Sequence, residues 1–346
     1  MTETNDDTIQ NRSEIAFVID AKDTNPNGDP LTADNEPRID PVTRQCVVTD
    51  VRLKRYLRDQ LVEDGHVVLI ANPNDDVLTR EEMYDAVEEE MGVSTEDAEP
   101  EELLKAFVKT AADVRYFGAT IALDTDLADD LPNQFEGPVQ FNHGRSYHEV
   151  ARNTESKQLA TVIANPNDDE EEETEKKEQG TFATDNRISY GVIGFGGRIN
   201  DNAAEDTRLT EADVERLDTL CWRALKNQTV TRSKAGQQPR LYVRVEYEQD
   251  GFEIGRLNDR IGVASNLPED EIRGTDDFQL NVSELVTALD DNEARIDTVH
   301  VTADSAVDFA LPDGETGNRD IFYAALEDAL GSDSVDAYDV YKRYAN

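Results

Sequence analysis

SEIAFVID, at residues 13–20, is a short run of apolar and β-branched residues. Such a run predicts a buried β-strand. The segment KDTNPNGDPLTADNEPRIDPVTRQ, at residues 22–45, is rich in Pro, Gly, Asn and Asp and therefore predicts a loop. After it, VVTDVRLKRYLRDQL, at residues 47–61, has the residue spacing of an amphipathic helix. The chain thus begins with a strand, a long turn-rich loop and a helix.

The predicted helix covers residues 49–61. Thr49 suits the N-cap position, and Asp50 favours the positive end of the helix dipole. The apolar face is expected to consist of Val51, Leu53, Tyr56, Leu57 and Leu61. A helix with one apolar face packs that face into a core.

Three further segments between residues 115 and 200 predict strands. They are residues 115–123 (RYFGATIAL), residues 137–150 (GPVQFNHGRSYHEV, a strand leading into a loop) and the Gly-rich residues 188–200 (ISYGVIGFGGRIN). Thr210 and Asp213 then form a capping-box-like start for a helix over residues 210–227.

The last third of the chain continues the same alternation. One face of a predicted strand carries Leu241, Val243, Val245 and Tyr247. Later elements are expected as a helix near 281–290, a strand near 297–303 and a helix near 319–330.

The central elements therefore follow the order strand, helix, strand, strand, helix, strand. This order predicts an α+β fold with an RRM-like (ferredoxin-like) sheet. We expect residues 1–12 to form a flexible tail and residues 13–346 to form one domain with insertions at about 66–112 and about 148–188. The first insertion is acidic and mostly helical, and the second contains the acidic run DDEEEETEKKE at 168–178. The segments on either side of this run can pair as a long hairpin.

The composition is strongly acidic. The chain has 76 acidic and 34 basic residues and a formal net charge of −42, while 37% of its residues are hydrophobic. A folded chain with acid spread along its whole length favours a salt-loaded cytoplasm, because molar salt shortens the Debye length to about 3 Å and screens self-repulsion. The alternative is an acidic protein that binds cations or basic partners. Its polar start and short apolar runs predict a soluble, cytoplasmic protein without membrane contact.

The first loop invites comparison with a calcium site. Asp23, Asn25, Asn27 and Gly28 match positions 1, 3, 5 and 6 of an EF-hand loop, with Asp34 at position 12. A strand precedes the loop, however, and two prolines lie inside it. A rigid turn whose N–H groups can hold a phosphate is therefore the preferred interpretation. The two cysteines and four histidines show neither a disulfide framework nor a zinc or triad pattern.

Cations are scarce in this chain, which makes a basic stretch of the first helix notable. Arg52, Lys54, Arg55 and Arg58 fall within seven residues. Arginine suits bidentate phosphate contacts. A solvated basic stripe is the alternative. A second cationic group lies in TRSKAGQQPRL, with Arg232, Lys234 and Arg240.

Two long motifs resemble a known family. FVIDAKDTNPNGDP and PRIDPVTRQCVVTDVRLKRYLRD resemble the N-terminal signature of the CRISPR-associated backbone proteins of type I effector complexes, most closely the Csh-type member of the Cas-seven family in type I-B systems. DVRYFGATIA, GPVQFNHGRSYH and TRSKAGQQPRL continue the resemblance in the expected order. One departure is Arg44, where the family pattern leads us to expect Gly.

The resemblance implies a specific function. Family members have an RRM-like palm with finger and thumb insertions, and several copies polymerise along one CRISPR RNA in the Cascade surveillance complex of antiviral defence. The guide pairs with target DNA, while the protein reads backbone and shape. Expected partners are CRISPR RNA, target DNA through guide pairing, the guide-processing endonuclease, the subunit that binds the guide's 5′ handle, and the large subunit. The resemblance implies no catalysis, cofactor or metal.

Carried onto this chain, the resemblance makes residues 66–112 the fingers and about 148–188 the thumb. RNA-binding residues are then expected in the first loop, the basic helix, one strand and the second basic group: Lys22, Asn25, Asn27, Arg38, Arg52, Lys54, Arg55, Arg58, Arg145, Arg232 and Lys234.

Two other functions remain open. Related backbone proteins of type III complexes cut RNA with a loop aspartate and a metal, a role open here to Asp20, Asp23 or Asp29. A calcium-stabilised structural protein is the second alternative.

Overall fold

The computed structural model describes residues 8–28, 35–69, 85, 88–89, 92, 100–120, 134–153, 157–160, 181–184, 186–228, 235–248 and 251–344. The centre of the fold consists of β1 (Ser13–Thr24), α1 (Asp50–Glu63), β6 (Gly144–Glu149), β10 (Arg187–Ile199), α6 (Glu211–Lys226) and β11 (Gln237–Tyr247). These elements follow the predicted order of strand, helix, strand, strand, helix, strand. The predicted α+β class is confirmed.

Strand β1 lies in the middle of the largest sheet. It pairs antiparallel with β10 on one side and with β11 on the other. Strand β6 pairs with the far side of β10, so β10 separates β1 from β6 as in a split βαβ unit. Further strands extend the sheet or pair with β10: β2 (Gln45–Val48), β5 (Val139–Phe141), β7 (Arg152–Asn153), β14 (Ile296–Ala303) and β17 (Val335–Ala337).

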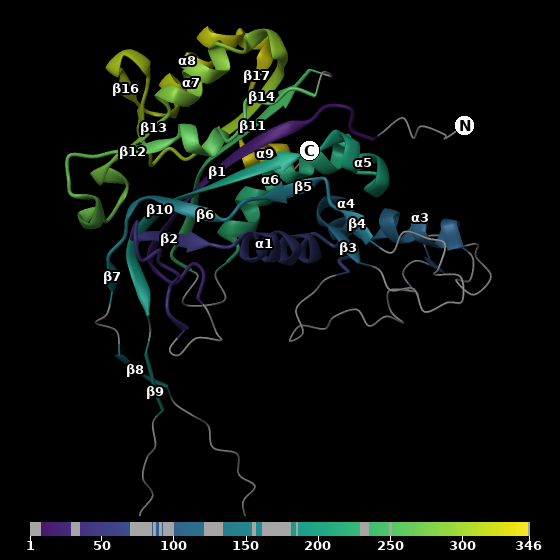
Figure 1. Ribbon diagram of the computed structural model, residues 1–346, viewed down its shortest axis with the longest axis horizontal. Coiled ribbons are helices and arrows are strands. Elements are labelled where there is room, and N and C mark those ends of the chain that lie inside the picture. Colours follow the sequence, from purple (N-terminus) through teal and green to yellow (C-terminus); the bar gives the residue numbers. More distant parts are fainter. Residues whose placement is uncertain are drawn as a thin grey trace, which may run out of the picture.

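Helices α1 and α6 cover one face of this sheet (Figure 1). Phe17 of β1, Leu57 of α1 and Leu217 of α6 belong to the same buried core. Helix α6 begins with the predicted capping box, in which the Thr210 hydroxyl accepts from the Asp213 backbone and the Asp213 carboxylate accepts from Thr210. The predicted start of this helix at Thr210 is therefore confirmed.

The C-terminal part of the chain covers the opposite face (Figure 1). Val18 of β1, Val243 of β11 and Phe322 belong to a second buried core on that face. The covering elements are β12 (Gly262–Ala264), α7 (Ser283–Asp290), β13 (Gln279–Asn281), β15 (Phe309–Ala310), β16 (Thr316–Gly317) and α8 (Arg319–Leu330). Both faces of β1 are thus buried.

Helix α1 differs from its prediction in one residue of the apolar face. Thr49 is the N-cap and accepts from the Arg52 backbone, as expected. Leu53 and Leu57 are buried, whereas Val51 is 67% exposed. Each residue turns a helix by about 100°, so Val51 lies roughly 200° away from Leu53. The prediction that Val51 packs into the core is therefore wrong.

The predicted strand over residues 115–123 is also wrong in its first half. Residues 112–117 form helix α4 (Ala112–Phe117), followed by the short strand β3 (Gly118–Thr120), which pairs with β4 (Gln134–Glu136). A short apolar run does not distinguish a buried helix from a buried strand. The helix is fixed by distant contacts, such as the Tyr116 hydroxyl donating to the Asp213 carbonyl at 2.6 Å.

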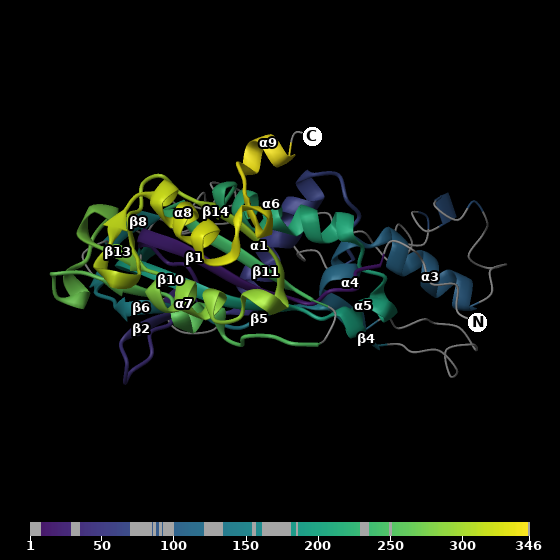
Figure 2. The ribbon, with the colours of Figure 1, turned by 90° about the horizontal axis from the view of Figure 1, so that it is seen from above.

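Residues 8–12, assigned above to the flexible tail, pack against the body. Ile9 is buried, and its N–H donates to the Leu209 carbonyl at 3.1 Å. Arg12 forms an ion pair with Asp201 at the start of α5 (Asp201–Thr207). In the first insertion, α3 (Pro100–Thr110) is helical as expected and lies at the end of the molecule opposite β13 (Figure 2). No described helix is long and apolar enough to cross a membrane.

The second insertion contains the predicted hairpin. Strand β8 (Lys157–Ala160) pairs antiparallel with β9 (Thr181–Thr184). The hairpin projects from the end of the sheet, away from the helices and the C-terminal elements (Figure 1). The acidic run 168–178 lies outside the described residues.

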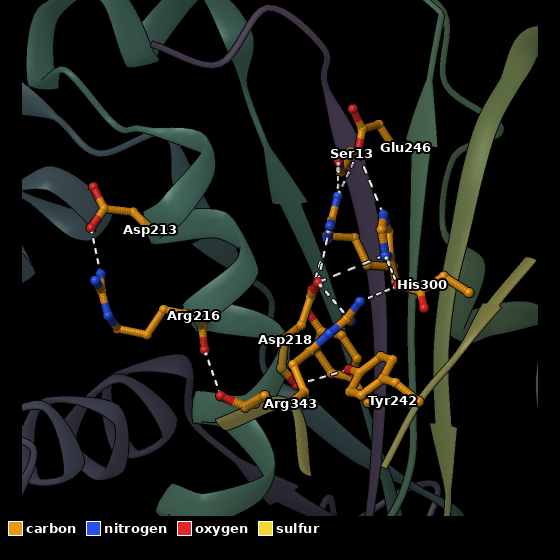
Figure 3. Close-up of polar contacts among 12 residues, drawn as sticks. Ser13, Asp213, Arg216, Asp218, Tyr242, Glu246, His300 and Arg343 are labelled. Atoms are coloured by element: carbon orange, nitrogen blue, oxygen red, sulfur yellow. Dashed lines mark hydrogen bonds and ion pairs between the residues drawn. The ribbon is translucent and has the colours of Figure 1, made fainter. Parts of the chain in front are cut away.

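A buried polar network connects α6 to the C-terminal strands (Figure 3). The Asp218 carboxylate on α6 accepts from Arg244 Nε at 2.7 Å and from Nη2 at 3.0 Å, and both side chains are almost fully buried. His300 Nδ1 lies 2.7 Å from the Asp336 carboxylate on β17, and Arg343 on α9 (Val340–Tyr344) pairs with the same carboxylate. The network therefore ties β17 and α9 to the centre of the fold.

Replacing Arg244 with Met should strongly destabilise the protein. The change leaves the Asp218 carboxylate buried without its principal countercharge, at an expected cost of about 3–5 kcal/mol. Urea unfolding would measure the loss. The matched control is Arg256→Met, because this arginine is 83% exposed and should change stability by no more than about 0.5 kcal/mol. Equal stability of the two variants would contradict the prediction.

Candidate nucleic-acid interface

Two of the four cations on α1 are held inside the protein. Lys54 Nζ donates to the Gln140 amide oxygen at 2.7 Å, and burial lowers the pKa of this lysine. Arg58 pairs with the fully buried carboxylate of Asp113 at 3.0 Å. Both cations also lie over the Phe117 ring, at 5.7 and 5.2 Å from its centroid. These side chains brace α1 against α4 and β5.

The other two cations on α1 are more accessible. Arg55 forms an ion pair with Asp59 at 2.7 Å, one turn further along the helix. Such a partly exposed pair contributes little and can be exchanged. Arg52 is half-buried and has no ion pair within the described part of the chain. The structure thus divides the basic stretch into a structural pair, Lys54 and Arg58, and a more exposed pair, Arg52 and Arg55.

The two asparagines predicted in the RNA groove are buried and hold the first loop in place. The Asn27 amide oxygen accepts from the Thr49 backbone at 3.0 Å and from its hydroxyl at 2.8 Å. The Asn25 amide donates to the Asn35 carbonyl at 2.7 Å. Asn27 therefore anchors the loop to the start of α1, and its oxygen is already used.

Lys22 and Arg38, from the same loop region, are exposed. Arg232 and Lys234 lie outside the described residues. The nearby Gly236 carbonyl accepts from the Lys22 backbone at 2.9 Å, so the described start of β11 lies beside the end of β1.

Arg145 and Arg38 lie on either side of Val47 at the β2–β6 edge of the sheet. Arg145 is opposite Val47 in the β2–β6 register, and the Val47 N–H donates to the Arg38 carbonyl at 2.8 Å. The Arg145 side chain is 52% exposed and pairs with Asp40 at 3.3 Å. Backbone N–H groups of Val42 and Thr43 are the main reason that the pKa of Asp40 is lowered.

Three further cations continue this edge and were missed by the sequence analysis. Arg44 pairs with Glu149 at 2.8 Å, and Arg152 pairs with Glu36 at 3.0 Å. Arg187 donates to the Asp23 carbonyl at 2.7 Å. Lys22 and Arg187 lie at neighbouring ends of the central strands β1 and β10. We call the whole set the arginine edge: Lys22, Arg38, Arg44, Arg145, Arg152 and Arg187.

One sequence signal could have found two of the three missed residues. Arg152 and Arg187 lie just inside the two ends of the second insertion, and Arg187 lies opposite Asn153 in the β7–β10 register. Both ends of an insertion must return to the same part of the sheet. Cations placed just inside both ends are therefore brought together.

Arg44 also explains the departure noted in its motif. Its backbone has φ 56°, in the left-handed region that favours Gly. The turn is thus the one that a glycine would adopt, and the arginine side chain is kept at the surface by Glu149 and Asp270.

The ion pairs of the arginine edge differ from the pair at Arg58. Arg44, Arg145 and Arg152 are 51%, 52% and 46% exposed, so each pair is worth about 0–1 kcal/mol and weakens with salt. A phosphate can replace such a carboxylate at small cost. The edge is therefore able to exchange its internal partners for an external polyanion.

His148 fixes the strand that carries Arg145. Its Nε2 accepts from the Val192 N–H of β10 at 3.1 Å, which requires the proton on Nδ1. Nδ1 lies 2.7 Å and 3.0 Å from the carbonyls of Glu149 and Glu269. Burial lowers the pKa of this histidine, so the neutral form holds the contacts.

The aspartates considered for metal catalysis have other contacts. Asp20 is 2% exposed, accepts from the Tyr190 hydroxyl at 2.6 Å and pairs with Arg240 at 2.7 Å, and burial raises its pKa. Asp23 is exposed and accepts from Asn153 at 3.3 Å. Asp29 lies outside the described residues. Within the described ranges, no three His, Cys, Asp or Glu side chains gather where they could hold a metal ion.

The fold and the arginine edge define an α+β protein with a projecting hairpin beside an exposed row of cations. A family model described as CRISPR-associated protein Cas7 matches residues 11–283. The chain belongs to this family. It is 43% identical over 338 residues to the CRISPR-associated protein Cas7 of Haloferax volcanii. The aligned residues cover 93% of this chain and 95% of that protein.

Two solved structures are similar in arrangement. One is described as a CRISPR RNA-guided surveillance complex, with a TM-score of 0.44, 13% identity, and coverage of 96% of this chain and 97% of that one. The other is described as a CRISPR RNA-guided surveillance complex, pre-nicking, with a TM-score of 0.48, 13% identity, and coverage of 96% and 98%.

Acid should weaken the protein through His148. Because the folded pKa is lowered, this histidine contributes its full stability above its ordinary value of about 6.5, and that contribution is lost as pH falls below it. The free energy of unfolding should therefore decrease by up to about 1.4 kcal/mol per pH unit between about pH 6.5 and 5.

Urea unfolding at several pH values would measure this slope. The slope should become shallower in His148→Asn, where burial of His66 lowers its pKa and leaves a smaller slope of the same sign, and it should persist in full in His143→Asn, whose imidazole is 54% exposed. His300 has a raised pKa and loses its contribution only above about pH 6.5, outside this window. An unchanged slope in His148→Asn would rule out the assignment.

Proposed function

We propose that the protein is a non-catalytic subunit that binds CRISPR RNA and forms the backbone of a type I-B Cascade surveillance complex. Several copies bind along one guide in the cytoplasm. The α+β unit acts as an RRM-like palm, residues 66–112 as fingers and residues 148–188 as the thumb. The observation that carries this proposal is the arginine edge beside the β8–β9 hairpin, in a chain with a net charge of −42.

Concentrating exposed cations on one edge is favourable for a strand of phosphates. Counterion release favours neutralisation of phosphates by Arg and Lys, and arginine adds bidentate hydrogen bonds. Contacts of this kind hold the backbone and do not read the bases. The guide bases thus stay available for pairing with target DNA.

The buried faces of the sheet support an edge-bound path for the RNA. RRM domains stack bases on aromatic residues of an open sheet face. Here Val18 of β1 and Tyr190 and Val192 of β10 lie beneath the C-terminal elements. The RNA strand is therefore held along the edge of the sheet and along the thumb. The remaining partners are the guide-processing endonuclease, the subunit that binds the 5′ handle and the large subunit.

Replacing Arg38 and Arg145 together with Ala should lower the RNA that copurifies with the protein by about tenfold or more. Each substitution removes one charge-assisted contact with a phosphate, and such contacts are worth about 1.5–3 kcal/mol. The ratio of RNA to protein, with sequencing of the recovered RNA, measures the effect. Alanine at Lys54 is a poorer test, because Lys54 also packs against Phe117.

The matched control is Arg198→Ala with Arg256→Ala. These arginines are 53% and 83% exposed and lie away from the arginine edge, so the change in charge is the same. Equal RNA content in the two double variants would show that the edge does not bind the guide.

The assembled complex should leave a complementary RNA intact in the presence of Mg²⁺. Asp20 is buried against Arg240 and Tyr190, so it does not offer a carboxylate to a metal. Gel analysis of end-labelled RNA would test this. Cuts at regular intervals that disappear in Asp23→Ala would instead establish a metal-dependent nuclease.

A further inference from the structure

A cleft of about 510 Å³ lies on the opposite edge of the sheet from the arginine edge. Its walls come from α6, the end of β14, the start of α8 and residues 337–342. Four of its lining residues are aromatic, although aromatic residues make up only 7% of the chain: Trp222, Tyr323, Tyr338 and Tyr341. Trp222 is 6% exposed and Arg343 lies 4.1 Å from the centroid of the Tyr338 ring, so Tyr341, at 56% exposure, is the ring on which a planar group can stack.

The same cleft carries three cations. Lys226 donates to Gln238 on β11, and Arg319 donates to the Ala303 carbonyl at 3.1 Å. Lys342 is exposed and forms no ion pair with the described residues. By contrast, the cavity bounded by residues 263–308 is lined by aspartates and by no cation.

The acidic residues of the cleft are mostly committed elsewhere. Asp304 pairs with Arg240, and the Asp339 carboxylate accepts from the Tyr341 and Lys342 backbones. Asp320 is 76% exposed and lies in the first turn of α8. Asp320 also lies 3.9 Å from Arg319, so Lys342 is the cation at the mouth of the cleft that has no ion pair with the described residues.

The buried network holds the aromatic wall in position (Figure 3). Asp336 and Arg343, at either end of residues 337–342, are paired with each other. Asp336 is also bonded to His300, and the Tyr338 hydroxyl donates to the Asp218 carbonyl at 2.9 Å. A wall fixed at both ends presents the Tyr341 ring at low entropic cost.

We propose that this cleft binds one unpaired nucleotide of a single-stranded nucleic acid, with the base stacked on the Tyr341 ring and a phosphate near Arg319 and Lys342. Aromatic platforms with flanking cations are what single strands require. The inference rests on the proposed function for the class of ligand, but it assigns a separate site. Ala21 pairs with Gln237, and Leu241 pairs with Ala303, so the cleft and Lys22 lie toward the same end of the strands.

A strand that leaves the arginine edge can reach the cleft by crossing this end of the sheet. Four strand spacings separate β6 from β14, which is roughly 19 Å. Arg240 and Lys226 lie on the intervening elements β11 and α6. The cleft would thus hold a segment that continues beyond the edge-bound nucleotides.

Trp222 is the single tryptophan of the chain, so its emission reports on this cleft. Titration of the full chain with octauridylate and with an eight-residue oligothymidylate should change the emission saturably with at least one of them. Tyr341→Ala combined with Lys342→Ala should weaken that binding about tenfold, the loss expected from removing one stacking platform. Arg198→Ala with Arg256→Ala should leave it unchanged.

Titration of the Arg38→Ala, Arg145→Ala variant separates this inference from the proposed function. An emission change that survives in this variant supports an independent site, even if the variant has lost its guide RNA. The inference is overturned if neither oligonucleotide changes the emission, or if Tyr341→Ala with Lys342→Ala binds as tightly as the wild type. It is also overturned if the response disappears in the Arg38, Arg145 variant. Unfolding curves of each variant confirm that the cleft is still folded.

Discussion

The double pairing of β1 is the constraint on which the rest of the structure depends. The strand is bonded to β10 on one side and β11 on the other, and apolar residues bury both of its faces. Over residues 13–21, a strand in this position offers no free backbone and no open surface, and only Lys22 and Asp23 near its end are exposed. Binding surfaces are therefore confined to the ends and edges of the sheet, which is where the arginine edge and the aromatic cleft lie. Both proposed binding surfaces therefore lie away from the buried centre of the sheet.

Local sequence signals predicted the helices and strands well, whereas contacts between residues distant in the sequence could be established only from the structure. Thr49 and Thr210 marked two helix starts because a cap acts on residues only three positions away. Arg58 was predicted to bind phosphate, but its carboxylate partner Asp113 lies 55 residues further along the chain. Burial of a cation depends on that partner and leaves no local trace in the sequence. The buried network around Asp218 could not be predicted for the same reason, because its members are distant from one another in the sequence.

Two kinds of ion pair with different physical consequences coexist in this acidic chain. Buried pairs such as Asp218 with Arg244 are little screened, so they hold α6 to β11 whatever the salt concentration. Pairs of the arginine edge are half-exposed and weaken in salt, which leaves their arginines open to competition. An external anion competes with Asp40 or Glu149 only because those pairs are weak. The acidic surface thus keeps the edge occupied by exchangeable carboxylates.

High salt imposes a further condition on any nucleic-acid contact. For a single strand, the logarithm of the binding constant falls by roughly 0.7 per phosphate contact for each logarithmic unit of salt. Charge alone therefore cannot hold RNA at the arginine edge in molar salt. Stacking on aromatic rings depends less on salt, and repetition of copies along one strand multiplies weak contacts. In the proposed assembly, the cleft at the far edge would supply the first of these, and the projecting β8–β9 hairpin would supply contacts between copies.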